Sequence, residues 1–466
     1  MKNKDENSTK ALKAGVWYTV SSFLRKGISF ISTPIFARLL SKSEFGSYSN
    51  FAVWLSICAV VCTLNLKSSV PRARFDYEDR FDEYISSVTF FGTAVTALFY
   101  CIVIAFQDFF VNLLGIDAIY LHVMFIELLV APALDNLQAK HRIMQKYKEQ
   151  VALSIFITLS STFFSVLGVY MMKDKLFGRI MGNEVTSTVI YLAVFIYVMY
   201  KGRKIIDVAA WKYAAVYSVP IIPHLLSNII LGSSDKVMIT KLIGKEANAM
   251  YSIAYSGGLI ISTLMTCFNQ AMVPWLFAKL HNEDYEVIRK VNRYYVTGFS
   301  IVVMGAILLA PEITWVLGGS KYSGSEMVVL PVMLGYGFKF AYTNYVNVEQ
   351  YEKKTGAVSV GTLIAAAFNI ITNLIFIPIY GYVAAAYTTL AGFLLLLVMH
   401  YFISKKYGFA NIYDNRFTFI QLAVMSAAGL ALQFLYPYVI LRWGLAFILG
   451  VFTLTGIFKI RKQYFV

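Results

Sequence analysis

Apolar residues occupy most of this chain in long runs, and short polar segments separate them. About fourteen runs of roughly twenty residues can be traced along the 466 residues, and an α-helix needs this length to cross the hydrocarbon core of a bilayer. The predicted spans are 15–36, 46–66, 85–106, 116–137, 151–172, 180–200, 213–230, 250–277, 294–317, 327–348, 357–379, 382–404, 417–435 and 443–460. The pattern predicts an all-α integral membrane protein with about fourteen transmembrane helices.

Composition and loop lengths agree with that prediction. Hydrophobic residues make up 58% of the chain and charged residues 14%, and a helix satisfies its own backbone polar groups where lipid surrounds it. The longest predicted connections are 67–84, 231–249 and 278–293. None of them is long enough to form a folded soluble domain.

Basic residues are distributed unevenly between the two sets of predicted loops. With the N-terminus inside, the cytoplasmic segments hold 28 Lys and Arg and the opposite segments hold 10. Short loops rich in Lys and Arg mark the cytoplasmic side, so both termini are expected in the cytoplasm. This asymmetry accounts for most of the net charge of +15. We therefore expect contact with anionic membrane lipids and no nucleic-acid partner.

A faint internal repeat runs through the chain. A shift of 203 residues places segment 38–49 on segment 241–252, and segment 147–154 matches segment 351–359 at nearly the same offset. Both matches pair a helix with the helix six positions later, as in transporters built from parallel repeats. The sequence therefore predicts two six-helix lobes and two further C-terminal helices, in the ranges 1–200, 201–404 and 405–466.

Three basic residues fall near the middle of predicted spans. Arg25 and Lys26 lie near the middle of the first span and Lys339 near the middle of the tenth. Each costs about 2.5 to 3.5 kcal/mol at the centre of a membrane helix on insertion scales, unless it faces water, an acidic partner or an anionic ligand. They are candidates for binding an anionic substrate. A structural ion pair with an acid on a neighbouring helix is the alternative.

Glu127 is the acidic residue that lies nearest the middle of any predicted span. A carboxyl group in that position can bind a coupling H⁺ or Na⁺, or it can neutralise Arg25 in the same lobe. Three other acids, Asp135, Glu184 and Asp235, lie nearer predicted helix ends. For these we expect solvated or capping roles.

Helix-perturbing residues mark the first helix of each predicted lobe. Gly27 and Pro34 lie in the first helix, and Pro220 and Pro223 lie in the seventh, beside His224. Proline removes an intrahelical hydrogen bond and bends the helix, and interrupted helices often form binding sites or hinges in transporters. We expect hinges at these glycine and proline positions, and we expect His224 to satisfy carbonyls that the prolines free.

Direct use of ATP is not expected. The chain has no G-x-x-x-x-G-K-[ST] phosphate-binding loop, and its scattered histidines suggest no acid–base cluster. We expect no resident cofactor and no metal site, and the four cysteines fall in predicted spans as small apolar fillers. The remaining energy sources for transport are an ion gradient and the downhill export of the substrate.

Two segments resemble a known family. Segment 36–49 follows the first helix, and Ser234, Asp235 and Lys236 precede segment 251–255. Together with fourteen helices and a short basic N-terminus, these segments are similar to polysaccharide flippases of the Wzx type. Those proteins belong to the multidrug, oligosaccharidyl-lipid and polysaccharide exporter (MOP) superfamily. The resemblance extends over essentially the whole chain and implies a MATE-like fold of two six-helix bundles around a central cavity.

The resemblance also implies a function. It implies alternating access that moves undecaprenyl-diphosphate-linked oligosaccharide repeat units across the bacterial plasma (inner) membrane, for O-antigen, capsule or exopolysaccharide synthesis. Arg25, Lys26 and Lys339 would then bind the diphosphate, since arginine suits bidentate phosphate contacts and lysine a point-charge contact. A polysaccharide polymerase and chain-length proteins would be partners.

Two other classes of protein remain as alternatives. A multidrug cation exporter of the same superfamily would favour acidic residues in the cavity, whereas the middle of the spans holds three basic residues and one acidic residue. A membrane enzyme of the polysaccharide pathway, such as a polymerase, would be expected to show a long external loop. The sequence therefore favours a transporter that is not an enzyme.

Overall fold

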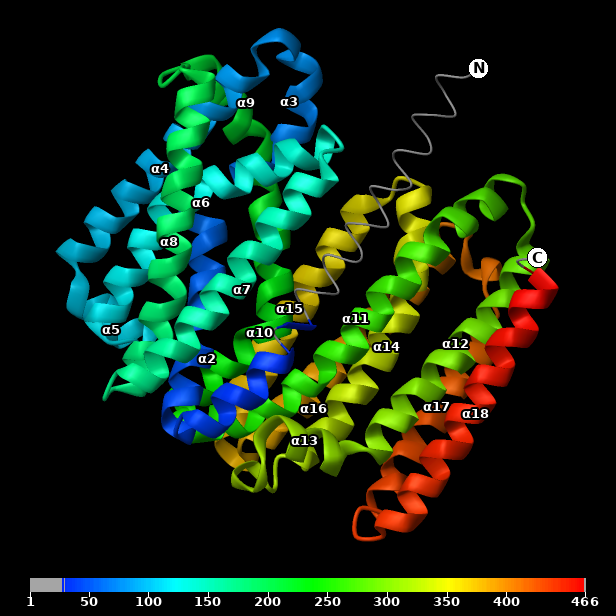
Figure 1. Cartoon of the computed structure of the whole chain (residues 1–466). Coiled ribbons are helices and arrows are strands. Elements are labelled where there is room, and N and C mark those ends of the chain that lie inside the picture. Colours follow the sequence, from blue (N-terminus) through cyan, green and yellow to red (C-terminus); the bar gives the residue numbers. More distant parts are fainter. Residues whose placement is uncertain (1–26, 29, 465–466) are drawn as a thin grey trace. The chain divides into compact units, whose positions relative to one another are not determined.

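The computed structural model describes residues 27, 28 and 30–464, and helices make up its regular structure (Figure 1). Each predicted span overlaps a helix in this part of the chain. Ten of the described helical segments are long and apolar enough to cross a membrane. The prediction of an all-α membrane protein is confirmed.

The described chain divides into two compact units, unit 1 over Met1–Ile229 and unit 2 over Ile230–Val466. The helices that begin in unit 1 are Phe30–Leu39, α2 (Lys42–Cys62), α3 (Val70–Asp76), α4 (Phe81–Ala105), α5 (Gln107–Leu114), α6 (Ala118–Ile143), α7 (Tyr147–Met171), α8 (Lys175–Gly202), α9 (Val208–Ser218) and α10 (Ile222–Leu242). Those of unit 2 are α11 (Lys245–His281), α12 (Tyr285–Leu308), α13 (Ala310–Gly318), α14 (Glu326–Tyr351), α15 (Thr355–Tyr380), α16 (Tyr382–Lys406), α17 (Asn415–Gln433) and α18 (Val439–Tyr464).

The boundary between the units falls inside α10, one membrane span later than the boundary expected between residues 200 and 201. Helix α9 packs within unit 1, where the indole of Trp211 donates a hydrogen bond to the carbonyl of Ser87 over 3.0 Å. The division into 1–200, 201–404 and 405–466 stays a prediction.

The order of elements in unit 1 recurs in unit 2. Helices α2, α4, α5, α6, α7 and α8 are followed by α11, α12, α13, α14, α15 and α16 with the same succession of long and short members. Helix α2 begins at Lys42 and α11 at Lys245, which is the offset of 203 seen in the sequence. The short helices α5 and α13 each follow a break at the end of a long span. This recurrence agrees with the parallel repeat expected from the sequence.

Local chemistry explains where α2 begins. The amide of Glu44 donates to Ser41 Oγ over 3.1 Å, and the amide of Ser41 donates to Glu44 Oε2 over 2.6 Å. This reciprocal pair is a capping box, which satisfies two backbone donors that the helix leaves open. Both residues lie in segment 36–49, so part of the family resemblance encodes a helix start.

The predicted loop 231–249 is wrong, because α10 continues to Leu242 and α11 begins at Lys245. The polar residues of this stretch led to the prediction of a loop. In the structure their side chains have partners inside unit 2, as described below. The predicted helix 294–317 is also interrupted. It divides into α12 and α13 around Leu309, just before Pro311, whose missing N–H suits the first turn of a helix.

One of the four expected hinge positions, Pro220, departs from regular α-helix. Pro220 lies in a 3₁₀ turn, Val219–Ile221, that separates α9 from α10. The carbonyl of Pro223 accepts a hydrogen bond from Ser227 Oγ over 2.7 Å, and the carbonyl of Pro34 accepts one from the guanidinium of Arg38 over 3.0 Å. Gly27 lies in helix. Side chains thus satisfy carbonyls near two of the prolines, and the hinge roles stay predictions.

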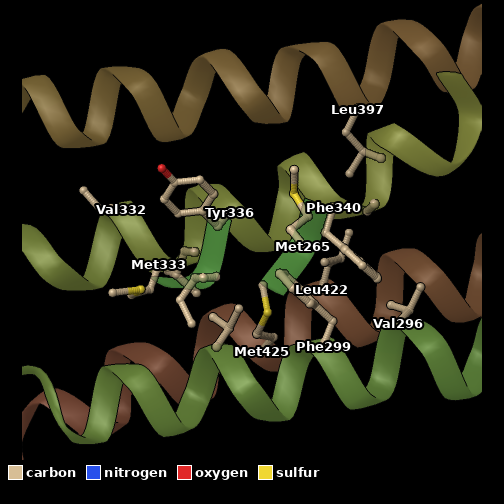
Figure 2. Packing of buried hydrophobic residues seen from close by; sticks show 14 of the residues in the cluster. Met265, Val296, Phe299, Val332, Met333, Tyr336, Phe340, Leu397, Leu422 and Met425 are labelled. Atoms are coloured by element: carbon tan, nitrogen blue, oxygen red, sulfur yellow. The ribbon is translucent and has the colours of Figure 1, made fainter. Parts of the chain in front are cut away.

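The core of unit 2 forms where α12, α14 and α17 pack together (Figure 2). The rings of Phe299 and Phe340 stack with their centroids 3.9 Å apart, and Leu422 and Met425 cover them from α17. Tyr336 lies on α14, which also bears a basic residue predicted from the sequence. Packing in this core therefore fixes the position of α14, the helix that bears Lys339.

Candidate functional site

Lys339 lies in the middle of α14 and is half-buried. Its ammonium group stands 5.3 Å from the centre of the Phe393 ring and 5.9 Å from that of Tyr336. Aromatic faces attract a cation and offset part of the cost of removing it from water. Of the three predicted phosphate-binding residues, Arg25 and Lys26 lie outside the described residues.

A second cation stands close to this position. Tyr336 forms a side-chain hydrogen bond with Tyr255 of α11, and the ammonium group of Lys236 lies 5.5 Å from the centre of the Tyr255 ring. The sequence placed Lys236 in a loop, which is wrong because the residue lies within α10. Lys236 and Lys339 therefore flank the Tyr255–Tyr336 pair within unit 2.

Asp235, the neighbour of Lys236, is 1% exposed. Its carboxylate accepts hydrogen bonds from Tyr251 Oη over 2.5 Å, from Thr389 Oγ1 over 2.6 Å and from the amide of Asn373 over 2.6 Å. The expected solvated or capping role of Asp235 is wrong, because the helix continues past this residue. The carboxylate of Asp235 thereby joins α10 to α11, α15 and α16.

Unit 1 contains a different acidic site. Glu127 on α6 is 7% exposed, and Glu184 on α8 is 1% exposed. The two carboxyl groups are close enough to interact, and the amide of Asn183 donates to Glu184 Oε1 over 2.7 Å. Two negative charges this close in a buried site repel each other, so the site favours binding of a cation or a proton. The expected solvated role of Glu184 is wrong, because its side chain is buried.

Arg179 provides a buried positive charge in the same unit. It is 9% exposed, and its guanidinium carbon lies 3.4 Å from the ring centre of Phe36 and 4.3 Å from that of Tyr48. The sequence assigned Arg179 to an outer loop because it lies at the edge of an apolar run. The structure places it within α8, and arginine stacks well on aromatic rings.

The repeat relates the two sites. Tyr48 and Tyr251 are equivalent under the shift of 203 residues. Tyr48 packs against Arg179 in unit 1, whereas Tyr251 donates to Asp235 in unit 2. Each unit thus has a buried polar cluster beside the same tyrosine of the repeat, but the clusters differ in charge. Apolar periodicity indicates that these helices exist and does not show which side chains meet.

Comparisons with known proteins agree with this architecture. The family model described as polysaccharide biosynthesis protein matches residues 11–281. A protein of the Lsg locus of Haemophilus influenzae is 22% identical, over 85% of this chain and 98% of that protein. The "Probable low-salt glycan biosynthesis flippase Agl15" of Haloferax volcanii is 22% identical, over 84% of each chain.

Solved structures show the same fold at low sequence identity. The lipid II flippase MurJ in its inward closed conformation matches with a TM-score of 0.71 and 14% identity, over 96% of this chain and 99% of that one. An inward-facing multidrug resistance MATE family transporter of the MOP superfamily matches with a TM-score of 0.58 and 11% identity, over 86% and 97% of the two chains. The MATE-like fold expected from the sequence is confirmed.

Proposed function

This chain belongs to the polysaccharide biosynthesis protein family, and we propose that it is a flippase for a lipid-linked oligosaccharide. The observation that supports this proposal most directly is the position of Lys339, a half-buried cation among aromatic rings in the middle of a long helix. A partly buried cation in a membrane protein is a functional-site candidate, because removing its charge from water is costly. An anionic group that binds there would offset that cost.

The proposed substrate is an undecaprenyl-diphosphate-linked oligosaccharide repeat unit. Its diphosphate would bind to Arg25, Lys26 and Lys339, where arginine gives bidentate contacts and lysine a point charge. The rings of Tyr336 and Phe393 beside Lys339 are buried, and their faces attract its ammonium group. The reaction is a translocation, so no covalent bond forms or breaks.

The transport cycle in this proposal is one of alternating access, driven by an H⁺ or Na⁺ gradient. Glu127 is the proposed coupling residue, and its burial beside the carboxyl group of Glu184 supports this role. Two adjacent negative charges would be costly in this interior, which favours binding of a cation or a proton there. Binding or loss of a cation at this pair would change the charge of unit 1 during the cycle.

The proposed location is the bacterial plasma membrane, with both termini in the cytoplasm. The 28 to 10 distribution of Lys and Arg between the predicted loops supports this orientation. There the protein would supply repeat units for a surface polysaccharide such as O-antigen, capsule or exopolysaccharide. A polysaccharide polymerase and chain-length proteins would act on the delivered units.

The second candidate function is export of a drug cation. The buried carboxyl groups of Glu127 and Glu184 favour it, because acidic residues attract cations. The lysines of unit 2 oppose it, since Lys236 and Lys339 both lie beside the aromatic pair. Cells that contain the protein would gain resistance to cationic drugs only under this second function.

The proposal is tested in cells that lack their own flippase and depend on this chain for polymer export. Lys339→Ala should abolish export and cause lipid-linked oligosaccharide to accumulate on the cytoplasmic side, at a normal amount of protein in the membrane. Lys339→Arg should retain part of the export because it keeps the charge. Lys245→Ala, at an exposed position at the start of α11, is the matched control and should export normally. Full export by Lys339→Ala and by Arg25→Ala would contradict the role of these charges.

A further inference from the structure

A carboxyl group and an imidazole meet in the interior of unit 2, away from the residues discussed above. Glu349 lies near the end of α14, and His400 lies on α16. Both side chains are 0% exposed, and His400 Nδ1 lies 2.9 Å from each carboxylate oxygen of Glu349. Nothing in the sequence indicates this pair, because 51 residues separate its members.

The contact determines which ring nitrogen exchanges a proton. An ionised carboxylate only accepts hydrogen bonds, so His400 Nδ1 carries a hydrogen and donates it to Glu349. The other nitrogen, Nε2, has no hydrogen-bond partner among the described residues. It faces Gly361 of α15, where an added Cβ would lie only 3.3 Å away. The glycine leaves space at the nitrogen that is open to protonation.

The two protonation states differ in net charge. With Nε2 unprotonated the pair has a charge of −1, and with Nε2 protonated the pair is neutral. A net charge is expensive inside a membrane protein, whereas a hydrogen-bonded neutral pair is much less so. The proton therefore determines whether this part of unit 2 can stay closed to water.

We infer that Glu349 and His400 form a proton-binding site of the transport cycle, in which His400 Nε2 takes up a proton from one side of the membrane and releases it to the other. The inference rests on the proposed transport function, and it places a proton site in unit 2 in addition to the acidic pair of unit 1. The complete burial of both side chains corresponds to a closed state of this site.

The bound proton determines the charge of the Glu349–His400 pair, because the neighbouring groups named here are uncharged or directed elsewhere. The ring of Tyr342 on α14 stacks on His400 with its centroid 5.6 Å away, and this titratable group is neutral at physiological pH. From α15, Gly361 lies against the imidazole, and on α16 the side chain one turn on is Ser404. Lys354, beyond the end of α14, directs its ammonium group over the ring of Tyr407 at 5.0 Å.

Helix α14 connects this site to the proposed substrate site. Lys339 and Glu349 are ten residues apart on α14, or about 15 Å along the axis. The same continuous helix therefore bears the cation proposed to bind phosphate and the carboxylate of the proton site. A movement of α14 that opens one site also displaces the other, which is how a proton and a substrate can be coupled through one rigid element.

The first test measures export in cells across a range of external pH, with and without an uncoupler. Glu349→Gln and His400→Gln should each lose the part of export that depends on the proton gradient. The matched controls are Glu352→Gln, just beyond the end of the same helix, and His281→Gln, an exposed histidine at the end of α11. Both controls should export like the unchanged protein. Gradient-dependent export at full rate in both Gln variants of the pair would overturn the inference.

The second test does not depend on transport. In bilayers that contain the protein labelled with ¹⁵N-histidine, His400→Gln identifies the His400 signal among the five histidines. As the pH is lowered, the His400 Nε2 signal should change from the unprotonated to the protonated form. A single form over the whole pH range would overturn the inference, even if export is normal. A normal titration in a chain that exports nothing would leave the site intact and count against the flippase function alone.

A variant that exchanges the two residues distinguishes loss of proton binding from damage to the fold. Glu349→His combined with His400→Glu keeps one carboxyl group and one imidazole in the same place. If the single variants fail to accumulate in the membrane, the exchanged variant should accumulate and recover gradient-dependent export. Recovery of the protein amount without recovery of gradient dependence would show that the pair is structural and would overturn the inference.

Discussion

Replacement of Asp235 by alanine is expected to destabilise unit 2 strongly. The carboxylate of Asp235 is the common acceptor for Tyr251, Thr389 and Asn373, and these donors come from three different helices. Asp235→Ala leaves all three donors without this acceptor in a site that is closed to water. The effect should therefore exceed that of an ordinary change on the surface of the protein.

The magnitude follows from the number of unsatisfied donors. Each buried donor that loses its partner costs about 1 to 3 kcal/mol, so three donors cost about 3 to 9 kcal/mol. Donors in contact reorganise together and their losses are not additive, which favours the lower end of this range. A loss of about 3 kcal/mol lowers the unfolding temperature of a domain of this size by about 6 to 12 °C.

The assay is thermal unfolding of the purified protein in lipid nanodiscs, followed by tryptophan fluorescence. Thr389→Val removes one of the three donors and the acceptor of the Asn369 amide, and should lower the unfolding temperature less than Asp235→Ala. Glu246→Ala, at an exposed position in the first turn of α11, should leave it unchanged. An Asp235→Ala protein that unfolds within about 2 °C of the unchanged protein would refute the reasoning, because three unsatisfied buried donors cannot cost so little.

Other regions allow three further predictions. An alanine Cβ at position 178 would lie 2.3 Å from a carbonyl oxygen of α7, so Gly178→Ala should lower the unfolding temperature, whereas Gly305→Ala, with no atom within 4 Å, should leave it nearly unchanged. Glu127→Gln should abolish gradient-driven export at a near-normal amount of protein, and full gradient-dependent export would exclude a coupling role. On a cysteine-free background, a cysteine at Asn112 should label from outside and one at Tyr77 only after permeabilisation, while labelling at position 77 in intact cells would reverse the orientation.

Much of the fold could be predicted from the sequence, because apolar runs of membrane length identify helices directly. The family resemblance, confirmed by the match over residues 11–281, and the offset between α2 and α11 both follow from local sequence. Helix ends were predicted less well where polar residues lie within helices. The run containing Asp235 and Lys236 was assigned to a loop because its side chains are polar, whereas partners on other helices satisfy them.

The candidate sites could be predicted only in part. A cation in the middle of a predicted span, such as Lys339, stands out in the sequence because charged residues are rare there. Glu349 and His400 lie near the ends of their runs, where charged residues are common, so nothing in the sequence distinguishes them. Their meeting depends on the packing of α14 against α16, and Arg179 likewise finds its aromatic partners only through the packing of α8. Contacts between distant segments are a property of the fold that residue spacing does not contain.

The most direct test of the proposed function is the side of the membrane on which lipid-linked oligosaccharide is exposed. In spheroplasts, periodate that cannot cross the plasma membrane oxidises only the sugar on the outer face. Cells with the unchanged chain should show most of their lipid-linked oligosaccharide oxidised, and cells with Lys339→Ala should show it protected at an equal amount of membrane protein. Equal oxidation in cells with and without the chain would contradict its function as a flippase.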